Sequence, residues 1–156
     1  MKEVAKLFVS VGASFLAGAV GSIFTAPAIT GWYEMLEKPA LNPPSWVFGP
    51  AWTTLYLLMG IAAFLVWRRG FGRRDVKIAL LAFAVQLVLN AIWSILFFGL
   101  RSPGWALAEI IVLWAAIITT TILFRRVSRP AAYLMLPYIL WVAFAAYLNW
   151  AIWTLN

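Results

Sequence analysis

The chain has 156 residues, of which 65% are hydrophobic and 11% are charged, and its formal net charge is +7. Soluble domains carry roughly a quarter charged residues, so this composition indicates a membrane protein. The sequence contains no cysteine and no histidine. Disulfides, thiolate metal sites and the side chain most often used as a general base, zinc ligand or haem ligand are therefore excluded. We expect no metal site and no required cofactor.

The excess of positive charge does not indicate nucleic-acid binding. Lys and Arg lie in short clusters between long apolar runs, for example Arg68–Arg74 and Arg125–Arg129. This pattern is typical of the loops of membrane proteins, whereas a nucleic-acid interface needs basic side chains spread over a soluble face. We expect a lipid bilayer as the surroundings and no nucleic acid as a partner.

The first predicted membrane span covers about residues 5–27, within the uncharged run Leu7–Ile29. This run reaches the roughly 20 residues that a helix needs to cross a bilayer. A cleaved signal peptide is the alternative, because Lys2 and Lys6 form a basic start and Ala26–Ala28 resembles a cleavage site. The apolar part of a signal peptide is usually about 7 to 15 residues long, so the length favours a retained span.

The first span is rich in small residues. Ser14, Gly18 and Ser22 follow one another at intervals of four residues, so they share one face of a helix. This spacing lets helix backbones approach closely in a membrane. We expect this face to pack against the other helices.

The stretch Gly31–Trp52 is the longest connection and carries four of the eight prolines. Pro43 and Pro44 fix their own φ angles and disfavour a helix that runs through them. Pro50 lies close to the start of the next apolar run, where a proline costs a helix little. Long connections in compact proteins are usually functional or disordered, and this one has too many apolar residues for disorder. We interpret it as a structured lid.

Four further spans follow, at about 46–67, 77–99, 104–124 and 131–155. The last contains Pro137, where we expect a kink. The sequence therefore predicts an all-α membrane protein: a single domain, 1–156, folded as a five-transmembrane-helix bundle with a long structured loop between helices 1 and 2.

The basic residues are distributed unequally between the two ends of such a bundle. Lys38 and Arg101 lie at the end that carries the long loop. The other ten lie at the opposite end: Lys2, Lys6, Arg68, Arg69, Arg73, Arg74, Lys77, Arg125, Arg126 and Arg129. The positive-inside rule predicts a multi-pass protein with its N-terminus inside and its C-terminus outside. In a prokaryote this would be the cytoplasmic membrane.

Polar and aromatic side chains inside the spans are candidates for a binding site, because burying them in lipid is costly. By helical spacing, shared faces carry Gln86, Asn90 and Trp93; Trp52, Tyr56 and Met59; and Tyr138, Trp141 and Asn149. Helix–helix packing and interfacial tryptophan belts are the alternative interpretation. Trp52 and Trp141 lie too deep for a belt, which favours a ligand-facing role for them. Glu109 is the only acidic residue within a span, and it either belongs to the site or lies near enough to the interface to be hydrated or to pair with Arg101.

Motifs along nearly the whole chain resemble one known family. They are Trp32-Tyr33…Leu36-x-Lys38-Pro39, Asn42-Pro43-Pro44-x-Trp46-Val47-Phe48-Gly49-Pro50-x-Trp52-x-x-Leu55-Tyr56-x-x-Met59-Gly60, Gln86-Leu87-x-x-Asn90-x-x-Trp93…Phe97-Phe98-Gly99, Gly104-Trp105-Ala106-Leu107 and Pro137-Tyr138-x-x-Trp141-x-Ala143-Phe144…Leu148-Asn149. The sequence closely resembles the translocator protein family, also called tryptophan-rich sensory proteins or peripheral-type benzodiazepine receptors (TspO/MBR).

The resemblance implies a five-helix bundle, commonly dimeric, with a ligand cavity under the first loop. Family ligands include protoporphyrin IX, sterols and planar drugs, and family roles include tetrapyrrole regulation and stress sensing. The family's cavity tryptophans match Trp52 and Trp141, and its loop tryptophan matches Trp32. From the faces and the resemblance together, the predicted ligand-binding residues are Trp32, Pro43, Pro44, Trp52, Tyr56, Gln86, Asn90, Trp93, Glu109, Tyr138, Trp141, Phe144 and Asn149.

Two departures from the family pattern bear on the ligand. Ala40 and Leu41 stand where many members have tryptophan, and no Lys or Arg follows Tyr147, so the family's proposed sterol motif is incomplete. The sequence favours a receptor or transporter-like protein for a metal-free porphyrin, with Lys38 or Arg101 reaching the propionates. Some bacterial members are reported to degrade porphyrin in light, which makes Trp52 and Trp141 candidates for catalysis. A cavity that holds only lipid is a third hypothesis.

Overall fold

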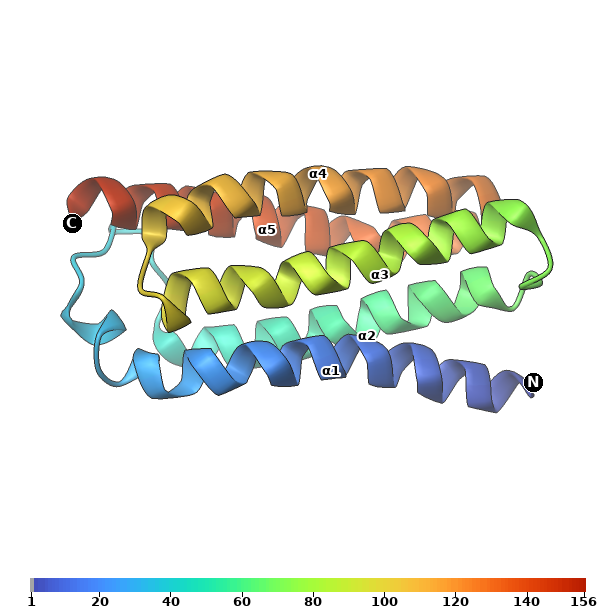
Figure 1. The fold of residues 1–156 in the computed structure, drawn as a ribbon, viewed down its shortest axis with the longest axis horizontal. Helices are drawn as coiled ribbons and strands as arrows, with labels where there is room; N and C mark the ends of the chain where they lie inside the picture. The colour runs from blue at the N-terminus through green and yellow to red at the C-terminus, as the bar shows by residue number, and fades with distance from the viewer. Residues whose placement is uncertain (1) are drawn as a thin grey trace.

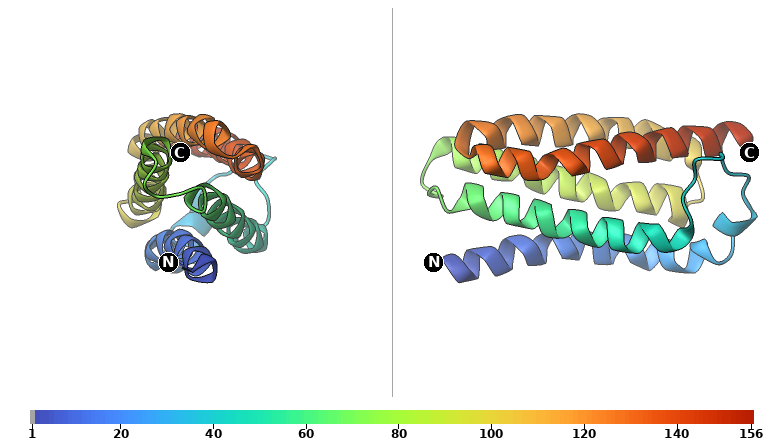
Figure 2. Two further views of the ribbon diagram at one scale, coloured as in Figure 1. Left: turned by 90° about the vertical axis from the view of Figure 1, so that its right-hand side faces the viewer. Right: turned by 180° about the vertical axis from the view of Figure 1, so that it is seen from behind.

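Five long helices lie side by side in the computed structural model, which describes residues 2–156 (Figures 1 and 2). They are α1 (Glu3–Ile29), α2 (Phe48–Trp67), α3 (Arg74–Ser94), α4 (Pro103–Val127) and α5 (Arg129–Leu155). Each is long and apolar enough to cross a membrane. The predicted all-α bundle of five transmembrane helices is therefore confirmed.

Most helices extend two or three residues beyond the spans predicted from the sequence. α3 begins at Arg74 rather than near residue 77, and α5 begins at Arg129, after Ser128 in an extended conformation. A span predicted from hydropathy includes only the apolar part of a helix, whereas charged first turns continue the same hydrogen-bonded backbone into the interface. α2 begins at Phe48, with Pro50 in its first turn as expected.

The third span ends in a wider helical turn. A turn of π-helix, η3 (Ile95–Gly99), follows α3 directly, and the Leu100 N–H donates to the Ile95 carbonyl over 2.8 Å. π-turns within α-helices are often found at functional sites. This one brings Phe97 and Phe98 to the end of the bundle where the chain connects α1 to α2.

The connection between α1 and α2, residues 30–47, forms the lid loop. It contains two short 3-10 helices, η1 (Tyr33–Met35) and η2 (Ser45–Val47). Figure 1 shows the lid loop at the same end of the bundle as the α3–α4 connection and the C-terminus. The N-terminus and the other two connections lie at the opposite end.

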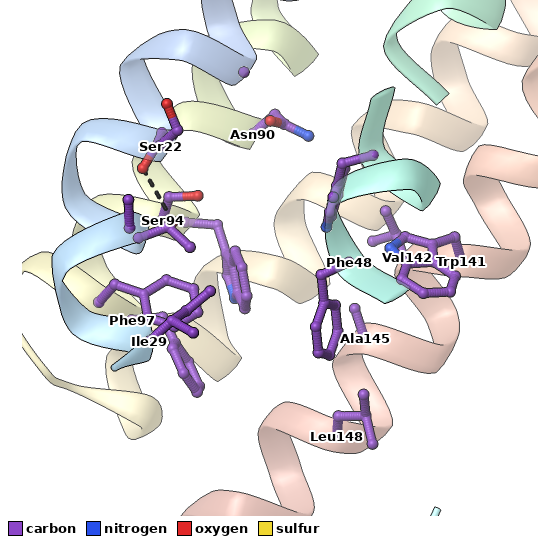
Figure 3. A pocket seen from close by; sticks show the side chains of 18 of the residues that line it. Ser22, Ile29, Phe48, Asn90, Ser94, Phe97, Trp141, Val142, Ala145 and Leu148 are labelled. Atoms are coloured by element: carbon purple, nitrogen blue, oxygen red, sulfur yellow. Dashed lines mark hydrogen bonds between the residues drawn. The ribbon is translucent and has the colours of Figure 1, made fainter. Parts of the chain in front are cut away.

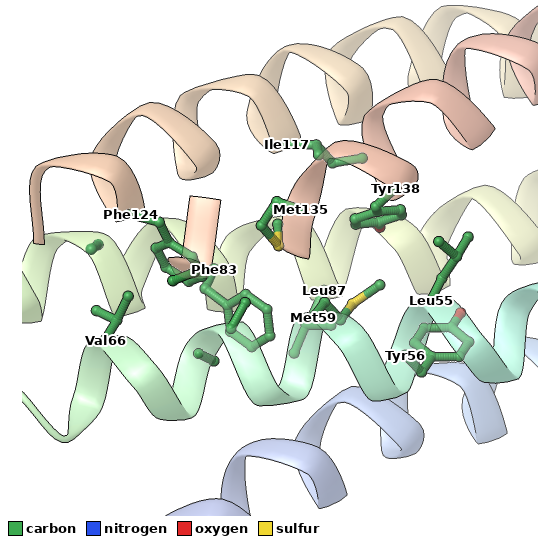
Figure 4. Close-up of a cluster of buried hydrophobic side chains, with 14 of the residues drawn as sticks. Leu55, Tyr56, Met59, Val66, Phe83, Leu87, Ile117, Phe124, Met135 and Tyr138 are labelled. Carbon is green, nitrogen blue, oxygen red and sulfur yellow. The ribbon is translucent and has the colours of Figure 1, made fainter. Parts of the chain in front are cut away.

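The core lies between α2, α3, α4 and α5. Its largest fully buried side chains include Met59, Phe124, Met135 and Tyr138 (Figure 4). α1 packs on this core through small residues: its buried positions are Ser10, Ser14, Ala17, Gly21 and Ala28. The backbones of α1 and α2 come close together, since a Cβ on Gly60 of α2 would lie 2.7 Å from the Val11 Cα of α1. Of the small-residue face predicted for the first span, Ser14 is buried in this packing, whereas Gly18 is partly buried and Ser22 is exposed.

Candidate functional site: an aromatic cavity beneath the lid loop

A cavity of about 720 Å³ lies between the five helices at the end of the bundle that carries the lid loop (Figure 3). Small-molecule sites typically have volumes of about 300–1,000 Å³ and mostly apolar walls. The lining side chains are mainly aromatic or small, and they come from every helix and from the lid loop. Figure 3 shows Phe48, Trp141 and Ala145 on one side of the opening, with Phe97 and Ile29 opposite.

A directed chain of hydrogen bonds runs from the wall of the cavity into the core behind it. The Tyr56 hydroxyl donates to Asn90 Oδ1 over 2.6 Å, and Asn90 Nδ2 donates to the Tyr138 hydroxyl over 2.7 Å. The Tyr138 hydroxyl donates in turn to Gln86 Oε1 over 2.8 Å. Gln86 ends the chain with a weak contact to the sulfur of Met59 at 4.0 Å. Because each donor already has its acceptor, the chain fixes the orientation of the Asn90 amide.

A second set of hydrogen bonds joins three helices near the lid loop. Trp93 Nε1 donates to Asn149 Oδ1 over 3.0 Å, and Asn149 Nδ2 donates to the Pro103 carbonyl over 2.8 Å. These bonds join α3, α5 and the first turn of α4. The Trp93 ring also stacks on Phe97 of η3, with centroids 5.1 Å apart. Both asparagines that line the cavity are thus held by partners from other helices.

Trp52 and Trp141 differ in how the protein holds their rings. Trp52 stacks on Tyr56, with centroids 5.6 Å apart, and meets Tyr138 edge-on at 6.2 Å. Trp141 contacts Phe48 edge-on at 6.2 Å and Phe144 at 5.9 Å. Trp141 Nε1 is buried and has no hydrogen-bond partner among residues 2–156. A buried donor without a partner is costly, so this indole N–H lowers the stability of the fold.

A family model described as "TspO/MBR family" matches residues 10–154. The chain belongs to the TspO/MBR family. It is 42% identical to the tryptophan-rich protein TspO of Chlorobaculum tepidum, over 99% of this chain and 98% of that protein. It is 45% identical to the protein of the same name from Archaeoglobus fulgidus, over 99% of both. It is also 42% identical to the translocator protein of Homo sapiens, over 88% of this chain and 82% of that one.

This membership supports a membrane receptor or transporter-like role for the chain. It also agrees with the fold, because five helices are long and apolar enough to cross a membrane. The resemblance stated from the sequence motifs is therefore confirmed. The chain is an integral, multi-pass membrane protein.

The cavity brings together about half of the residues predicted from sequence. The predicted residues that line it are Trp52, Tyr56, Asn90, Trp93, Trp141, Phe144 and Asn149. Gln86 and Tyr138 are fully buried behind the wall and reach it only through the hydrogen bonds to Asn90. Trp32 contacts the ring of Phe97, which does line the cavity, at 5.8 Å. The two adjacent prolines of the lid loop, Pro43 and Pro44, lie outside the lining, although the next residue, Ser45, is part of it.

Residues that the sequence analysis did not select also line the cavity. The lid loop contributes Tyr33, and α1 contributes a row that includes Phe15, Gly18 and Ser22. Tyr33 packs on Phe98 at 5.7 Å and its hydroxyl donates to Asn42 over 3.1 Å. Burial raises the pKa of Tyr33 above its ordinary value, so the hydroxyl stays protonated as a donor. The spacing of Ser14, Gly18 and Ser22 was interpreted as a packing face, but Gly18 and Ser22 line the cavity.

Glu109 does not make the expected pair with Arg101. Both carboxylate oxygens of Glu109 are buried, and neither has a hydrogen-bond partner within the described chain. Arg101 lies exposed in the α3–α4 connection, with φ +52°. Glu109 itself lies outside the lining of the cavity, and the next residue, Ile110, is part of that lining.

Lys38 is held by the lid loop itself. Its Nζ donates to the carbonyl oxygens of Leu36 over 3.0 Å and Glu34 over 3.4 Å. The same ammonium group lies 4.7 Å from the centre of the Tyr33 ring, a distance typical of a cation–π contact. Neither Lys38 nor Arg101 belongs to the lining of the cavity.

Proposed function

We propose that the protein binds a planar hydrophobic ligand of the porphyrin class in the cavity beneath the lid loop, and that it acts as a receptor or transporter-like protein for that ligand. The observation that carries the proposal is the 720 Å³ cavity with Trp52 and Trp141 in its wall. Indole rings offer flat apolar surfaces on which a macrocycle can stack. The few polar side chains of the lining, such as Asn90 and Asn149, are held in place by hydrogen bonds to other helices, as is usual in a mostly apolar ligand site.

A role in tetrapyrrole regulation or stress sensing follows from this proposal, since such a protein would report on the amount of bound ligand. A homodimer in the membrane is part of the proposal as well, by analogy with the family. Porphyrin is proposed as a ligand and not as a cofactor, and stacking on the indole rings is the contact proposed for it.

The test is a titration of the purified protein in nanodiscs with protoporphyrin IX, followed by tryptophan emission and by porphyrin absorbance. We expect saturable quenching at about one porphyrin per chain. Ala145 lines the cavity, so Ala145→Trp should fill it and abolish binding. Ala108 is exposed on α4, so Ala108→Trp is the matched control and should bind normally. Quenching that does not saturate, or that Ala145→Trp leaves unchanged, would contradict the proposal.

Light-driven oxidation of the bound porphyrin, with dissolved oxygen as the oxidant, is a second candidate function. The stacking of Trp52 on Tyr56 favours it, because it places two readily oxidised rings together in the cavity wall. Product analysis in light and in darkness separates this candidate from simple binding.

A further inference from the structure

The end of the bundle opposite the lid loop carries positive charge that the protein itself does not balance. The two acidic residues at this end are already paired: Glu3 contacts Lys6 at 3.1 Å and Arg68 at 3.4 Å, and Asp75 contacts Arg73 at 2.6 Å. Within residues 2–156, no ion pair includes the arginines at the adjoining ends of α3, α4 and α5. These exposed arginines are Arg74, Arg125, Arg126 and Arg129.

Buried apolar contacts hold these three helix ends together. Val76 of α3, Phe124 of α4 and Ala131 of α5 are fully buried and belong to one hydrophobic cluster. Along the chain, each of the four arginines lies within two residues of one of these buried side chains. Figure 1 shows the start of α3, the end of α4 and the start of α5 at the same end of the molecule. The packing of the helices therefore gathers the four positive charges.

The start of α5 adds a backbone contribution to this basic cluster. Ser128 is the N-cap residue of α5, and its side chain forms no capping hydrogen bond. The first turn of a helix has N–H groups without partners in the helix, and its partial positive charge favours an anion. Arg126 and Arg129 flank Ser128 in the sequence, so the uncapped end of the helix lies among charges of the same sign.

The exposed face of α5 that begins at Arg129 changes from charged to apolar along the helix. Arg129, Tyr133, Leu136 and Leu140 follow one another at intervals of three or four residues, and all four are exposed. On α4, Ile122 is also exposed, one turn before the arginines. The order along this face is a cation, a phenol and then aliphatic side chains. The phosphate, the ester groups and the acyl chains of a phospholipid follow the same order.

We propose that the ends of α3, α4 and α5 bind one anionic phospholipid, with its phosphate at the four arginines and its acyl chains along α4 and α5. Clusters of four or more basic residues beside membrane helices attract anionic lipids. The planar guanidinium group, with several donors, suits phosphate oxygens. None of the four arginines lines the cavity beneath the lid loop, so this site is separate from the proposed function.

The test is a lipid titration of the purified protein in detergent, in which native mass spectrometry counts the lipids bound to each chain. The probes are phosphatidylglycerol and phosphatidylcholine with the same acyl chains. We expect one phosphatidylglycerol to bind about tenfold more tightly than phosphatidylcholine, because its net negative charge is not balanced by a choline group. Excess inorganic phosphate should not displace it, because phosphate has no acyl chain. Equal affinity for the two lipids, or displacement by phosphate, would overturn the proposal.

A triple variant tests the arginines directly. Arg125→Gln, Arg126→Gln, Arg129→Gln should lower the affinity for phosphatidylglycerol to about that for phosphatidylcholine, since each basic residue near the surface contributes to the attraction. The same three positions changed to Lys keep the charge and should keep most of the preference. Thermal unfolding without added lipid checks that both variants are folded. A Gln variant that is folded and still prefers phosphatidylglycerol as the wild type does would place the lipid elsewhere.

A matched control separates the local cluster from the total charge. Lys2→Gln, Lys6→Gln, Arg68→Gln removes the same number of charges from the same end of the bundle, but beside Glu3. This variant should bind phosphatidylglycerol as the wild type does. An equal loss of affinity in the two Gln variants would show that only the overall charge attracts the lipid, and would overturn the assignment of a site.

Discussion

The side-chain amide of Asn156 pairs with the backbone of Glu37, which lies 119 residues earlier in the chain. The Glu37 N–H donates to Asn156 Oδ1 over 3.1 Å, and Asn156 Nδ2 donates to the Glu37 carbonyl over 2.9 Å. Asn156 Nδ2 also donates to the carbonyl of Ile152, a residue that lines the cavity from α5. These hydrogen bonds connect the lid loop to the C-terminal end of α5, and both of these segments contribute residues to the lining of the cavity.

Asn156→Leu should loosen the lid loop. Both hydrogen bonds to Glu37 would be lost, and a protein hydrogen bond contributes about 0.5–1.5 kcal/mol. We expect faster amide hydrogen exchange at Glu37 and faster release of a bound porphyrin, with a smaller effect on equilibrium affinity. Thr154→Val is the control, because the Thr154 hydroxyl bonds only within α5. Unchanged exchange at Glu37 would mean that Asn156 does not hold the loop.

Phe substitutions at Trp52 and Trp141 should have different effects on ligand binding. Trp52→Phe keeps a ring against Tyr56 and should cost about 0.5–1.5 kcal/mol of binding free energy, the usual scale of an aromatic contact. Trp141→Phe also removes the unpartnered donor, so it should weaken ligands that carry a hydrogen-bond acceptor more than octaethylporphyrin, which has no acid group. Calorimetric or fluorescence titration measures both. Equal losses for both kinds of ligand would show that the Trp141 N–H does not contact the ligand.

The Trp52→Phe, Trp141→Phe double variant tests the light-driven reaction. Phenylalanine is much harder to oxidise than an indole, so porphyrin breakdown in light should fall steeply if these residues carry the oxidation. The control is Trp67→Phe, at the opposite end of α2 and outside the cavity. Breakdown at the wild-type rate in the double variant would exclude these indoles from the chemistry.

Glu109→Gln should stabilise the protein. Both carboxylate oxygens of Glu109 are buried without a partner in the described chain, and an ionised carboxylate costs far more to bury than a neutral amide. Glutamine keeps the shape and cannot carry a negative charge, so we expect a higher midpoint of thermal unfolding in detergent. The exposed Glu34→Gln serves as the control. A lower midpoint for Glu109→Gln would reveal a stabilising interaction of the carboxylate.

Gly60→Ala should weaken the packing of α1 on α2. The added methyl group would lie 2.7 Å from the Val11 Cα, and a backbone atom cannot rotate away. We expect a loss of about 1–3 kcal/mol, the usual cost of overpacking. Gly12→Ala, on the same helix as Val11, meets nothing within 4 Å and should be neutral or slightly stabilising. Thermal unfolding of both variants gives the comparison, and equal midpoints would show that the two helices do not approach so closely.

The orientation in the membrane is predicted from the basic residues at the end opposite the lid loop. The sequence has no cysteine, so single cysteines can report it without background. Leu41→Cys in the lid loop should react with a membrane-impermeant maleimide in intact cells, whereas Phe71→Cys between α2 and α3 should react only after lysis. Both positions are exposed. The reverse pattern would place the lid loop inside.

The sequence by itself was sufficient for the five helices and for the end of the bundle at which each connection lies. Apolar length and the positions of Lys and Arg are local properties, and each span satisfies its own backbone hydrogen bonds, so its existence does not depend on its neighbours. Helical spacing also placed Asn90 and Trp93 on one face correctly. The motifs then supplied the family and drew attention to Trp52 and Trp141.

The rotation and depth of each helix were decided only by the tertiary structure. Gln86 shares a face with Asn90, yet it is buried behind the wall, because the packing of α2 and α5 on α3 covers one and leaves the other at the cavity. Spacing along one helix gives an angle about its own axis and no information about its partners.

Contacts between residues that lie far apart in the chain could likewise not be predicted from the sequence. From the position of Lys38 in the sequence we expected its ammonium group to contact a ligand. Instead, the lid loop folds so that this group donates a hydrogen bond to a backbone carbonyl and lies over the Tyr33 ring. The pairing of Glu37 with Asn156 leaves no local signal in either segment. Such contacts arise only when the bundle brings distant segments together, because each partner alone would bond equally well to water.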